Sequence, residues 1–422
     1  MGKRLGIYIH IPFCASKCSY CDFYSLSGCD YLMPEYHEAL LDHLEESAPA
    51  IKQYEVDSIY FGGGTPSFYG ADRIVDIFNT LKLNGNVRTD AEVTVECNPD
   101  SISLNALKLL REEGVNRISL GVQASDNNLL KLIGRRHNFQ QAQRAVYNAR
   151  KAGFDNVSVD LIYGLPSQTK SDWADTLAKV VELHPEHISC YGLKLEPGTE
   201  MYQNYKGSLL LPDDDDQADM YCYAAEMLSR YGYKQYEISN FAAPGFESRH
   251  NLKYWNLDDY MGFGPGAHSC VGNLRYSFIK DLKQYISGID RQVSIIDEYE
   301  NIDPLERAVE YIMLGMRTTR GISERDYRLR CQCDWRPVYQ ALLAFRQKGW
   351  AVEEEGRWHF TVPGFLLSNS LIGILLEAQA SGRIEGTPWL RDAFQAEEKT
   401  SVPKSEREIF AELYKQQVKE DK

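Results

Sequence analysis

The sequence predicts an α/β fold in which an open, partial (β/α)6 TIM-like barrel is followed by a smaller C-terminal α+β domain of winged-helix type. Three observations support this prediction. Short apolar runs alternate with amphipathic helical stretches in the first half of the chain, unusual motifs follow the ends of the apolar runs, and the last third changes to a helix–turn–strand pattern. Six β/α units rather than eight predict a barrel that does not close fully.

Each apolar run suits a buried parallel strand, and each stretch between two runs is long enough for a right-handed crossover helix. The predicted strands cover residues 5–10, 56–61, 92–97, 117–121, 156–162 and 187–193. The predicted helices cover residues 34–46, 71–81, 104–113, 139–152 and 171–183. Because functional groups collect at the carboxyl ends of barrel strands, we expect the motifs that follow these strands to converge.

The second half of the chain is less regular. An acidic run at 213–216 precedes a predicted helix over 217–230, where carboxylates complement the helix dipole. A region rich in glycine and aromatic residues follows at 236–276, and further patterns predict helices over 304–317 and 335–349, a turn at 353–356 and a strand at 357–362. The expected division is a barrel (1–240), a connecting region (241–300), a C-terminal domain (301–380) and a polar tail (381–422).

Composition excludes several classes of function. The 422 residues carry a net charge of -14, which does not favour a nucleic-acid-binding surface. No apolar run is long enough to cross a bilayer, so no transmembrane segment is expected. Ten cysteines without a secretion signal indicate a reducing compartment, and we expect the protein in the cytoplasm.

The most informative motif is C-x3-C-x2-C, formed by Cys14, Cys18 and Cys21. A four-iron cluster usually takes one thiolate per iron, so three thiolates leave one iron open to a small molecule. A structural zinc site is the alternative, because Cys29 lies eight residues after Cys21 and could supply a fourth ligand.

This spacing resembles the radical S-adenosylmethionine (SAM) superfamily, in which SAM closes the open position of a 4Fe-4S cluster. Gly62-Gly63-Gly64-Thr65-Pro66 follows the second predicted strand and resembles the segment that grips the SAM amino group. Adjacent glycines indicate that backbone approaches a ligand closely. The resemblance implies that SAM is bound by residues at the strand ends and in these loops, namely Tyr8, Tyr20, Gly64, Thr65, Glu96, Gln123, Arg135 and Asp160.

A second motif contains His250, Asn251, Tyr254 and Trp255. If this segment is helical, His250 and Tyr254 share one face. An imidazole beside two large aromatic side chains is a plausible haem seat, since His is a common axial ligand. A neutral imidazole is the better iron ligand, so binding through His250 should weaken as the ring protonates near its usual pKa of about 6.5.

The resemblance is closest to the oxygen-independent coproporphyrinogen III dehydrogenase branch of radical SAM proteins, and it extends from about residue 5 to about residue 376. The oxidases of that branch carry a further cysteine two residues after the third cluster cysteine, where this chain has Phe23. The haem chaperones of the branch, the HemW group, carry the His-Asn-x-x-Tyr-Trp motif. The resemblance therefore implies a haem chaperone.

The predicted function is binding of haem, on a scaffold with a 4Fe-4S cluster and SAM, and its transfer to haem proteins such as membrane respiratory enzymes. Two alternatives stay open: radical decarboxylation of coproporphyrinogen III, and radical SAM chemistry on another substrate. The sequence leaves open whether SAM is cleaved, and so whether the protein is an enzyme. It also leaves open whether haem is held covalently, whether two copies associate, and whether the protein sits peripherally at the membrane.

Overall fold

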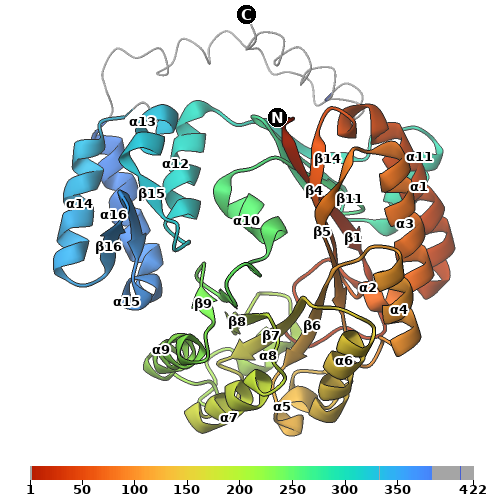
Figure 1. The fold of residues 1–422 in the computed structure, drawn as a ribbon, viewed down its shortest axis with the longest axis horizontal. Helices are drawn as coiled ribbons and strands as arrows, with labels where there is room; N and C mark the ends of the chain where they lie inside the picture. The colour runs from red at the N-terminus through yellow and green to blue at the C-terminus, as the bar shows by residue number, and fades with distance from the viewer. Residues whose placement is uncertain (1, 332, 383–408, 410–422) are drawn as a thin grey trace, which may run out of the picture.

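The computed structural model describes residues 2–331, 333–382 and 409. Figure 1 shows a curved sheet with helices on its outer side and a smaller C-terminal unit facing it across the helix α10. Of the predicted tail, 381–422, the structure describes residues 381, 382 and 409, and Ile409 is buried against the barrel core. Within the described ranges, no helix combines the length and the hydrophobicity needed to cross a bilayer.

All six predicted strands are present and run parallel in sequence order. They are β1 (Arg4–Ile11), β4 (Glu55–Gly63), β5 (Val87–Cys97), β6 (Arg117–Gln123), β7 (Val157–Tyr163) and β8 (His187–Gly192). The sheet does not close on itself, since its order runs from β14 through β1 and β8 to β9. The prediction of an open barrel is confirmed.

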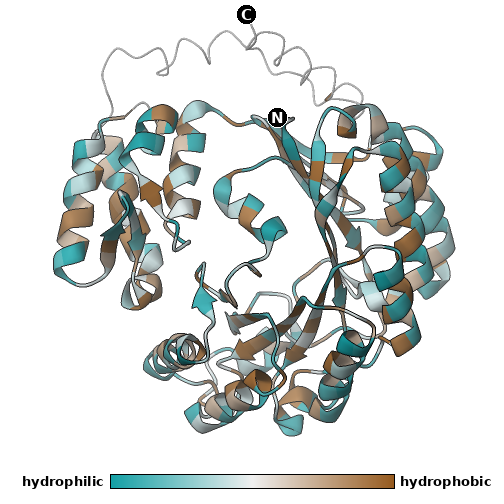
Figure 2. Cartoon of the chain, in the orientation of Figure 1, coloured by the Kyte–Doolittle hydropathy of each residue, from teal (hydrophilic) through white to brown (hydrophobic). Residues whose placement is uncertain are grey.

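The crossover helices lie where the sequence placed them. They are α1 (Met33–Ile51), α3 (Ala71–Asn84), α4 (Leu104–Glu112), α6 (Phe139–Lys151), α7 (Lys170–Val181) and α9 (Asp214–Arg230). Each buries its apolar stripe against the sheet, so hydrophobic residues gather along the strands and the inward helix faces (Figure 2). The acidic run caps α9 as expected, because the Asp213 carboxylate accepts a hydrogen bond from the Asp216 amide at 2.8 Å.

The glycine- and aromatic-rich region extends the sheet, which the sequence did not predict. β11 (Tyr260–Phe263) pairs parallel with β1, and three antiparallel strands follow it: β12 (His268–Val271), β13 (Leu274–Phe278) and β14 (Ile296–Asn301). At the other end, β10 (Asn240–Ala242) and β9 (Lys234–Gln235) continue antiparallel from β8. Short helices and strands complete this part of the chain: β2 (Phe13–Cys14), β3 (Leu26–Ser27), η1 (Asp30–Leu32), α2 (Pro66–Tyr69), α5 (Asn127–Leu132), α8 (Glu200–Tyr205), α10 (Arg249–Asn256) and α11 (Leu282–Asp290).

The C-terminal unit has its own hydrophobic core. It contains α12 (Pro304–Gly315), β15 (Ile322–Ser323), α13 (Glu324–Cys331), α14 (Trp335–Gln347), β16 (Ala351–Glu354), β17 (Arg357–Phe360), α15 (Val362–Leu366) and α16 (Ser368–Ser381). The three strands pair in the order β15-β17-β16. The expected helix, turn and strand are α14, the β16–β17 turn and β17, and the sequence missed β15 and β16.

Strand register determines which side chains face the barrel interior. Glu96 on β5 pairs with Ser119 on β6, and Asp160 on β7 pairs with Ser189 on β8. Side chains at directly paired positions point to the same face of a sheet. The interior of this barrel is consequently lined by polar side chains at the level of Glu96 and Asp160.

Candidate functional site

A cavity of about 450 Å³ runs through the barrel interior, from the cysteine loop after β1 to the helix α10. Five strands, β4 to β8, contribute to its wall, as do the loops that follow β1 and β4. Of the predicted site residues, it is lined by Cys14, Cys18, Cys21, Tyr20, Gly64, Thr65, Glu96, Gln123, Arg135, Asp160 and Asn251. The structure therefore brings together motifs that are far apart in the sequence.

The three cysteines are half-buried and held by neighbours that can donate hydrogen bonds to sulfur. The Sγ of Cys14 lies 3.3 Å from the hydroxyl of Thr65. The Sγ of Cys18 accepts a hydrogen bond from Nη1 of Arg135 at 3.6 Å. Such donors stabilise thiolates, the form that binds iron.

This donor set fits a 4Fe-4S cluster bound by Cys14, Cys18 and Cys21, each on a different iron. Cys29, the possible fourth zinc ligand, precedes η1 and does not line the cavity. In the part of the chain that the structure describes, no three His, Cys, Asp or Glu side chains are grouped closely enough to hold a single metal ion. A cluster, when bound, would supply an iron with an open coordination position for SAM.

The glycine loop packs closely against the backbone of the cysteine segment, and Gly64 and Thr65 also line the cavity. The amide of Gly64 donates to the carbonyl of Ile11 at 2.7 Å, and the amide of Thr65 donates to that of Phe13 at 2.8 Å. A Cβ on Gly64 would lie 2.8 Å from both carbonyl oxygens. Gly64 thus lets the loop after β4 pack directly on the segment that carries Cys14.

Three polar side chains, those of Arg135, Asp160 and Gln123, line the cavity in separate settings. Arg135 donates to the carbonyl of Gly121 at 2.5 Å and to the side chain of Asn98 at 2.6 Å. Asp160 accepts hydrogen bonds from the hydroxyls of Ser119 (2.9 Å) and Ser189 (2.6 Å). Gln123 lies at a β-bulge with a positive φ of 69°. Such strain is common where a side chain is re-aimed toward a ligand.

Glu96 is the most perturbed acid of the cavity. Its carboxylate accepts a hydrogen bond from the hydroxyl of Tyr60 at 2.7 Å. Burial, reinforced by the nearby Asp160, raises the pKa of Glu96 to about 7 although the bond from Tyr60 opposes this shift. The nearby Arg117 also lowers this pKa, but Glu96 forms no ion pair among the described residues, so its carboxylate is well suited to receive an ammonium group.

Tyr8 does not line the cavity, unlike the other residues predicted to bind SAM. Its hydroxyl lies 3.0 Å from Nδ1 of His10, and its ring is stacked near the rings of Tyr60 and His250. Contact between Tyr8 and SAM stays a prediction. Its place is in the aromatic packing between β1, β4 and α10.

The His-Asn-x-x-Tyr-Trp motif forms a helix, α10, that lies against the inner side of the barrel (Figure 1). The carboxylate of Glu92 on β5 accepts hydrogen bonds from the amides of Arg249 (3.0 Å) and His250 (2.9 Å). Nζ of Lys253 forms a buried ion pair with Asp57 at 2.6 Å. These contacts anchor both ends of the helix to the strands.

His250 points into the barrel and is only 1% exposed. Its Nδ1 lies 2.9 Å from the hydroxyl of Ser58, and its Nε2 lies 2.9 Å from that of Tyr254. Burial, with Lys253 and Arg117 nearby, lowers the pKa of His250 to about 3, so the expected protonation near pH 6.5 is wrong for this environment. Coordination of haem iron by His250 would require one of its two hydrogen bonds to break.

The outer face of α10 borders a second cavity of about 440 Å³. Asn251, Tyr254 and Trp255 line this cavity, which extends to β12, β13 and α12. Asn251 and Tyr191 line both cavities. The motif helix is therefore a wall between the cavity at the cysteine loop and the cavity beside the C-terminal unit.

Sequence reasoning missed several residues of the first cavity, notably Tyr60 and Arg117. Arg117 is 1% exposed, and its Nε and Nη1 have no hydrogen-bond partner among the described residues. Because arginine side chains are usually exposed, the sequence did not indicate that Arg117 is buried. The alternation of polar and apolar residues along β4 and β6 could have identified both, because they lie on the polar side of their strands.

Comparisons with known proteins agree with this geometry. The model of the radical SAM superfamily matches residues 8–180, and that of the HemN C-terminal domain matches residues 302–367. The fold resembles that of coproporphyrinogen III oxidase (HemN) from Escherichia coli, with a TM-score of 0.78 and 24% identity over 89% of this chain and 90% of that one. At this identity the likeness concerns the fold.

The sequence relatives are more specific. The heme chaperone HemW of Bacillus subtilis is 35% identical over 87% of this chain and 98% of its own length. The HemW proteins of Lactococcus lactis and Escherichia coli are 34% and 32% identical, over 87% and 88% of this chain and 96% and 98% of their own lengths. The chain belongs to the HemW family. In this HemW-family chain, α10 lies between the two ranges that the domain models match.

Proposed function

We propose that the protein is a haem chaperone that binds haem and passes it to haem-requiring proteins, including membrane respiratory enzymes. The observation that carries this proposal is the position of α10, whose motif distinguishes the HemW group and which lines both cavities. Three aromatic side chains of the second cavity, Tyr254, Trp255 and Tyr260, supply the flat apolar contacts that a tetrapyrrole requires.

In this proposal the first cavity holds the cluster and SAM. Cys14, Cys18 and Cys21 would bind the cluster, and Glu96 would receive the SAM ammonium group. Arg135 holds Cys18 and the end of β6 in place through its hydrogen bonds to sulfur and to the carbonyl of Gly121. The cluster and SAM, when bound, would supply the chemistry of the radical SAM superfamily, whether or not this protein uses it.

The test compares haem binding with porphyrinogen turnover. Protein reconstituted anaerobically should bind about one haem per chain and show a Soret band, and the loaded protein should lose haem to a haem-free acceptor. The same protein with SAM and a reductant should not convert coproporphyrinogen III. Sustained turnover without haem binding would instead establish the oxidase.

A cysteine series tests the cluster separately. Cys18→Ala should abolish the four-iron cluster. Apart from the three motif cysteines, Cys97 on β5 is the one thiol among the described lining residues, and it is buried in the strand. Cys29→Ala is the matched control and should keep full iron content. Loss of iron in Cys29→Ala, or zinc in place of iron in anaerobically prepared wild type, would contradict the cluster assignment.

A further inference from the structure

We infer that haem is seated in the second cavity, between α10 and α12, and that the thiolate of Cys270 rather than the imidazole of His250 binds its iron. This inference rests on the proposed function and names the site at which that function is carried out. It starts from the two ring nitrogens of His250, both of which are engaged inside the barrel. Since the inner face of α10 is already engaged, the outer face is the one that can contact haem.

The outer face has the composition that haem requires. The cavity of about 440 Å³ falls within the range of about 300–1,000 Å³ that is typical of small-molecule sites. Its aromatic wall is formed by Tyr254 and Tyr260, whose ring centroids are 4.7 Å apart, together with Trp255. Leu257 and Leu314 add aliphatic contacts from the end of α10 and from α12.

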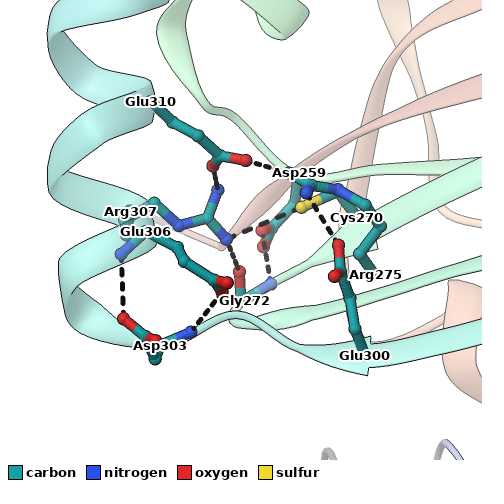
Figure 3. Close-up of polar contacts among 9 residues, drawn as sticks. All are labelled: Asp259, Cys270, Gly272, Arg275, Glu300, Asp303, Glu306, Arg307 and Glu310. Carbon is teal, nitrogen blue, oxygen red and sulfur yellow. Dashed lines mark hydrogen bonds and ion pairs between the residues drawn. The ribbon is translucent and has the colours of Figure 1, made fainter.

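Cys270 is the side chain of this lining best suited to bind haem iron. It lies on β12 opposite Tyr260 of β11, and it is 7% exposed. Nη2 of Arg307 donates a hydrogen bond to its sulfur at 3.6 Å (Figure 3). Thiolate is an established axial ligand of haem iron, and a guanidinium beside the sulfur would stabilise the thiolate in the complex.

The charged wall beside Cys270 favours an additional anion. Figure 3 shows Arg275 and Arg307 converging on the carboxylate of Glu310, whose side chain is 13% exposed. The second carboxylate that pairs with Arg275, that of Glu300, is half-exposed. Two guanidinium groups thus share one buried carboxylate, and their remaining N–H groups could donate hydrogen bonds to a thiolate or to a haem propionate.

Two buried acceptors on the cavity wall are free to bind a molecule held in the cavity. Glu237 and Asn240, on another part of its wall, are 1% and 4% exposed. One side-chain oxygen of each has no hydrogen-bond partner among the described residues. Buried acceptors normally find a donor, which water held in the cavity beside the haem would supply.

The binding step balances without a redox partner. Ferric haem enters with water on its iron, the Fe–O bond to one water and the Sγ–H bond of Cys270 break, and an Sγ–Fe bond forms. The water and the proton leave to solvent, and the iron remains ferric throughout. The thiolate offsets the single net positive charge of ferric iron in the dianionic porphyrin ring.

The experiment titrates reconstituted, full-length protein with ferric haem and records absorbance and electron paramagnetic resonance. The wild type should show the signature of thiolate-ligated haem. Cys270→Ser should lose that signature and bind haem at least about tenfold more weakly. Cys222→Ser, outside both cavities, is the matched control and should resemble wild type.

A second variant tests the location of the haem-binding site independently of the residue that binds the iron. Leu314→Trp should fill the cavity from α12 and abolish haem binding while iron content and SAM binding stay at wild-type levels. If wild type binds haem and both Cys270→Ser and Leu314→Trp leave the spectrum and affinity unchanged, the inference is overturned. If only Leu314→Trp acts, the seat stands and the Cys270 ligand is overturned. Failure of wild type to bind haem would overturn the proposed function itself.

Discussion

At the scale of single residues, the carboxyl group of Glu96 decides how the barrel cavity receives a cation. It is buried beside Asp160 and accepts a hydrogen bond from the neutral hydroxyl of Tyr60, and the nearby guanidinium of Arg117 offsets only part of the rise in its pKa. An ionised Glu96 is therefore costly, and in the proposed function the SAM ammonium group would reduce that cost by forming an ion pair with it.

SAM affinity should consequently depend on pH. The pKa of Glu96 is about 7, so the carboxylate is mostly ionised at pH 8 and mostly protonated at pH 6, and SAM affinity should fall about tenfold between these values. Anaerobic calorimetry checks this expectation. Glu96→Gln should bind SAM weakly at both pH values, and an unchanged pH dependence in that variant would show that another group is responsible.

Gly64 gives a different prediction from the one its motif suggests. A side chain there would collide with the carbonyls of Ile11 and Phe13, not with a ligand in the cavity. Gly64→Val should therefore displace the segment that carries Cys14 and lower iron content together with SAM binding. Iron and sulfide analysis of the purified variant tests this, with Gly373→Val on α16, where an added Cβ meets no atom within 4 Å, as the control. Full iron content with SAM binding alone reduced would favour a ligand contact instead.

At the scale of elements, α10 owes its position to one side chain of a neighbouring strand. Glu92 is buried and accepts hydrogen bonds from the first two amides of the helix. A negative charge at a helix N-terminus also complements the helix dipole. The strand β5 thus places Glu96 in the first cavity and, through Glu92 in its middle, also positions the motif helix.

Removing this contact should loosen α10. Glu92→Ala should lower the free energy of unfolding by about 3 kcal/mol, because two hydrogen bonds to a buried carboxylate are lost, and it should weaken haem binding. Chemical denaturation and haem titration measure the two effects. Glu46→Ala, an exposed position on α1, is the control. Equal stability of the Glu92 variant and wild type would contradict this role.

Strands and helices with a strong hydrophobic pattern were predicted from the sequence, and those with a weak pattern were missed. The strands around Ile59 and Val95 were predicted from apolar runs between amphipathic helical stretches, and their positions are confirmed. β11 spans only Tyr260–Phe263 and contains a glycine, so no pattern marked it as a strand. The motif indicated that His250 and Tyr254 share a helix face, but only the packing of α10 against β4 shows which way the imidazole points.

At the scale of the whole molecule, the C-terminal unit is tied to the barrel by polar contacts across α12. Arg275 of β13 pairs with Glu310 of α12, and Arg307 of α12 donates to the carbonyl of Gly272 at 2.6 Å (Figure 3). The amide of Ile238 also donates to the carbonyl of Arg317 at 2.9 Å. Because the second cavity lies between the two units, these contacts determine its width.

Neutralising Glu310 should weaken this connection. Glu310→Gln leaves two guanidinium groups without their shared carboxylate, and it should lower the free energy of unfolding by about 2 kcal/mol. Amide hydrogen exchange should speed up in α12 and in the β12–β13 hairpin while that of β5 and β6 is unchanged. Glu300→Gln, at a half-exposed side chain, should have a much smaller effect. Uniform exchange rates in the two variants would contradict the connection.

The acidic strand β14 affects whether two copies of the molecule can associate through the edges of their sheets. It forms one end of the sheet, with no neighbour on its outer side in the described ranges, and Asp297, Glu298 and Glu300 are exposed along it. An unpaired strand edge is a template on which another strand can add. Here such an approach would bring like charges together, so the open barrel resists polymerising edge to edge, most strongly at low ionic strength.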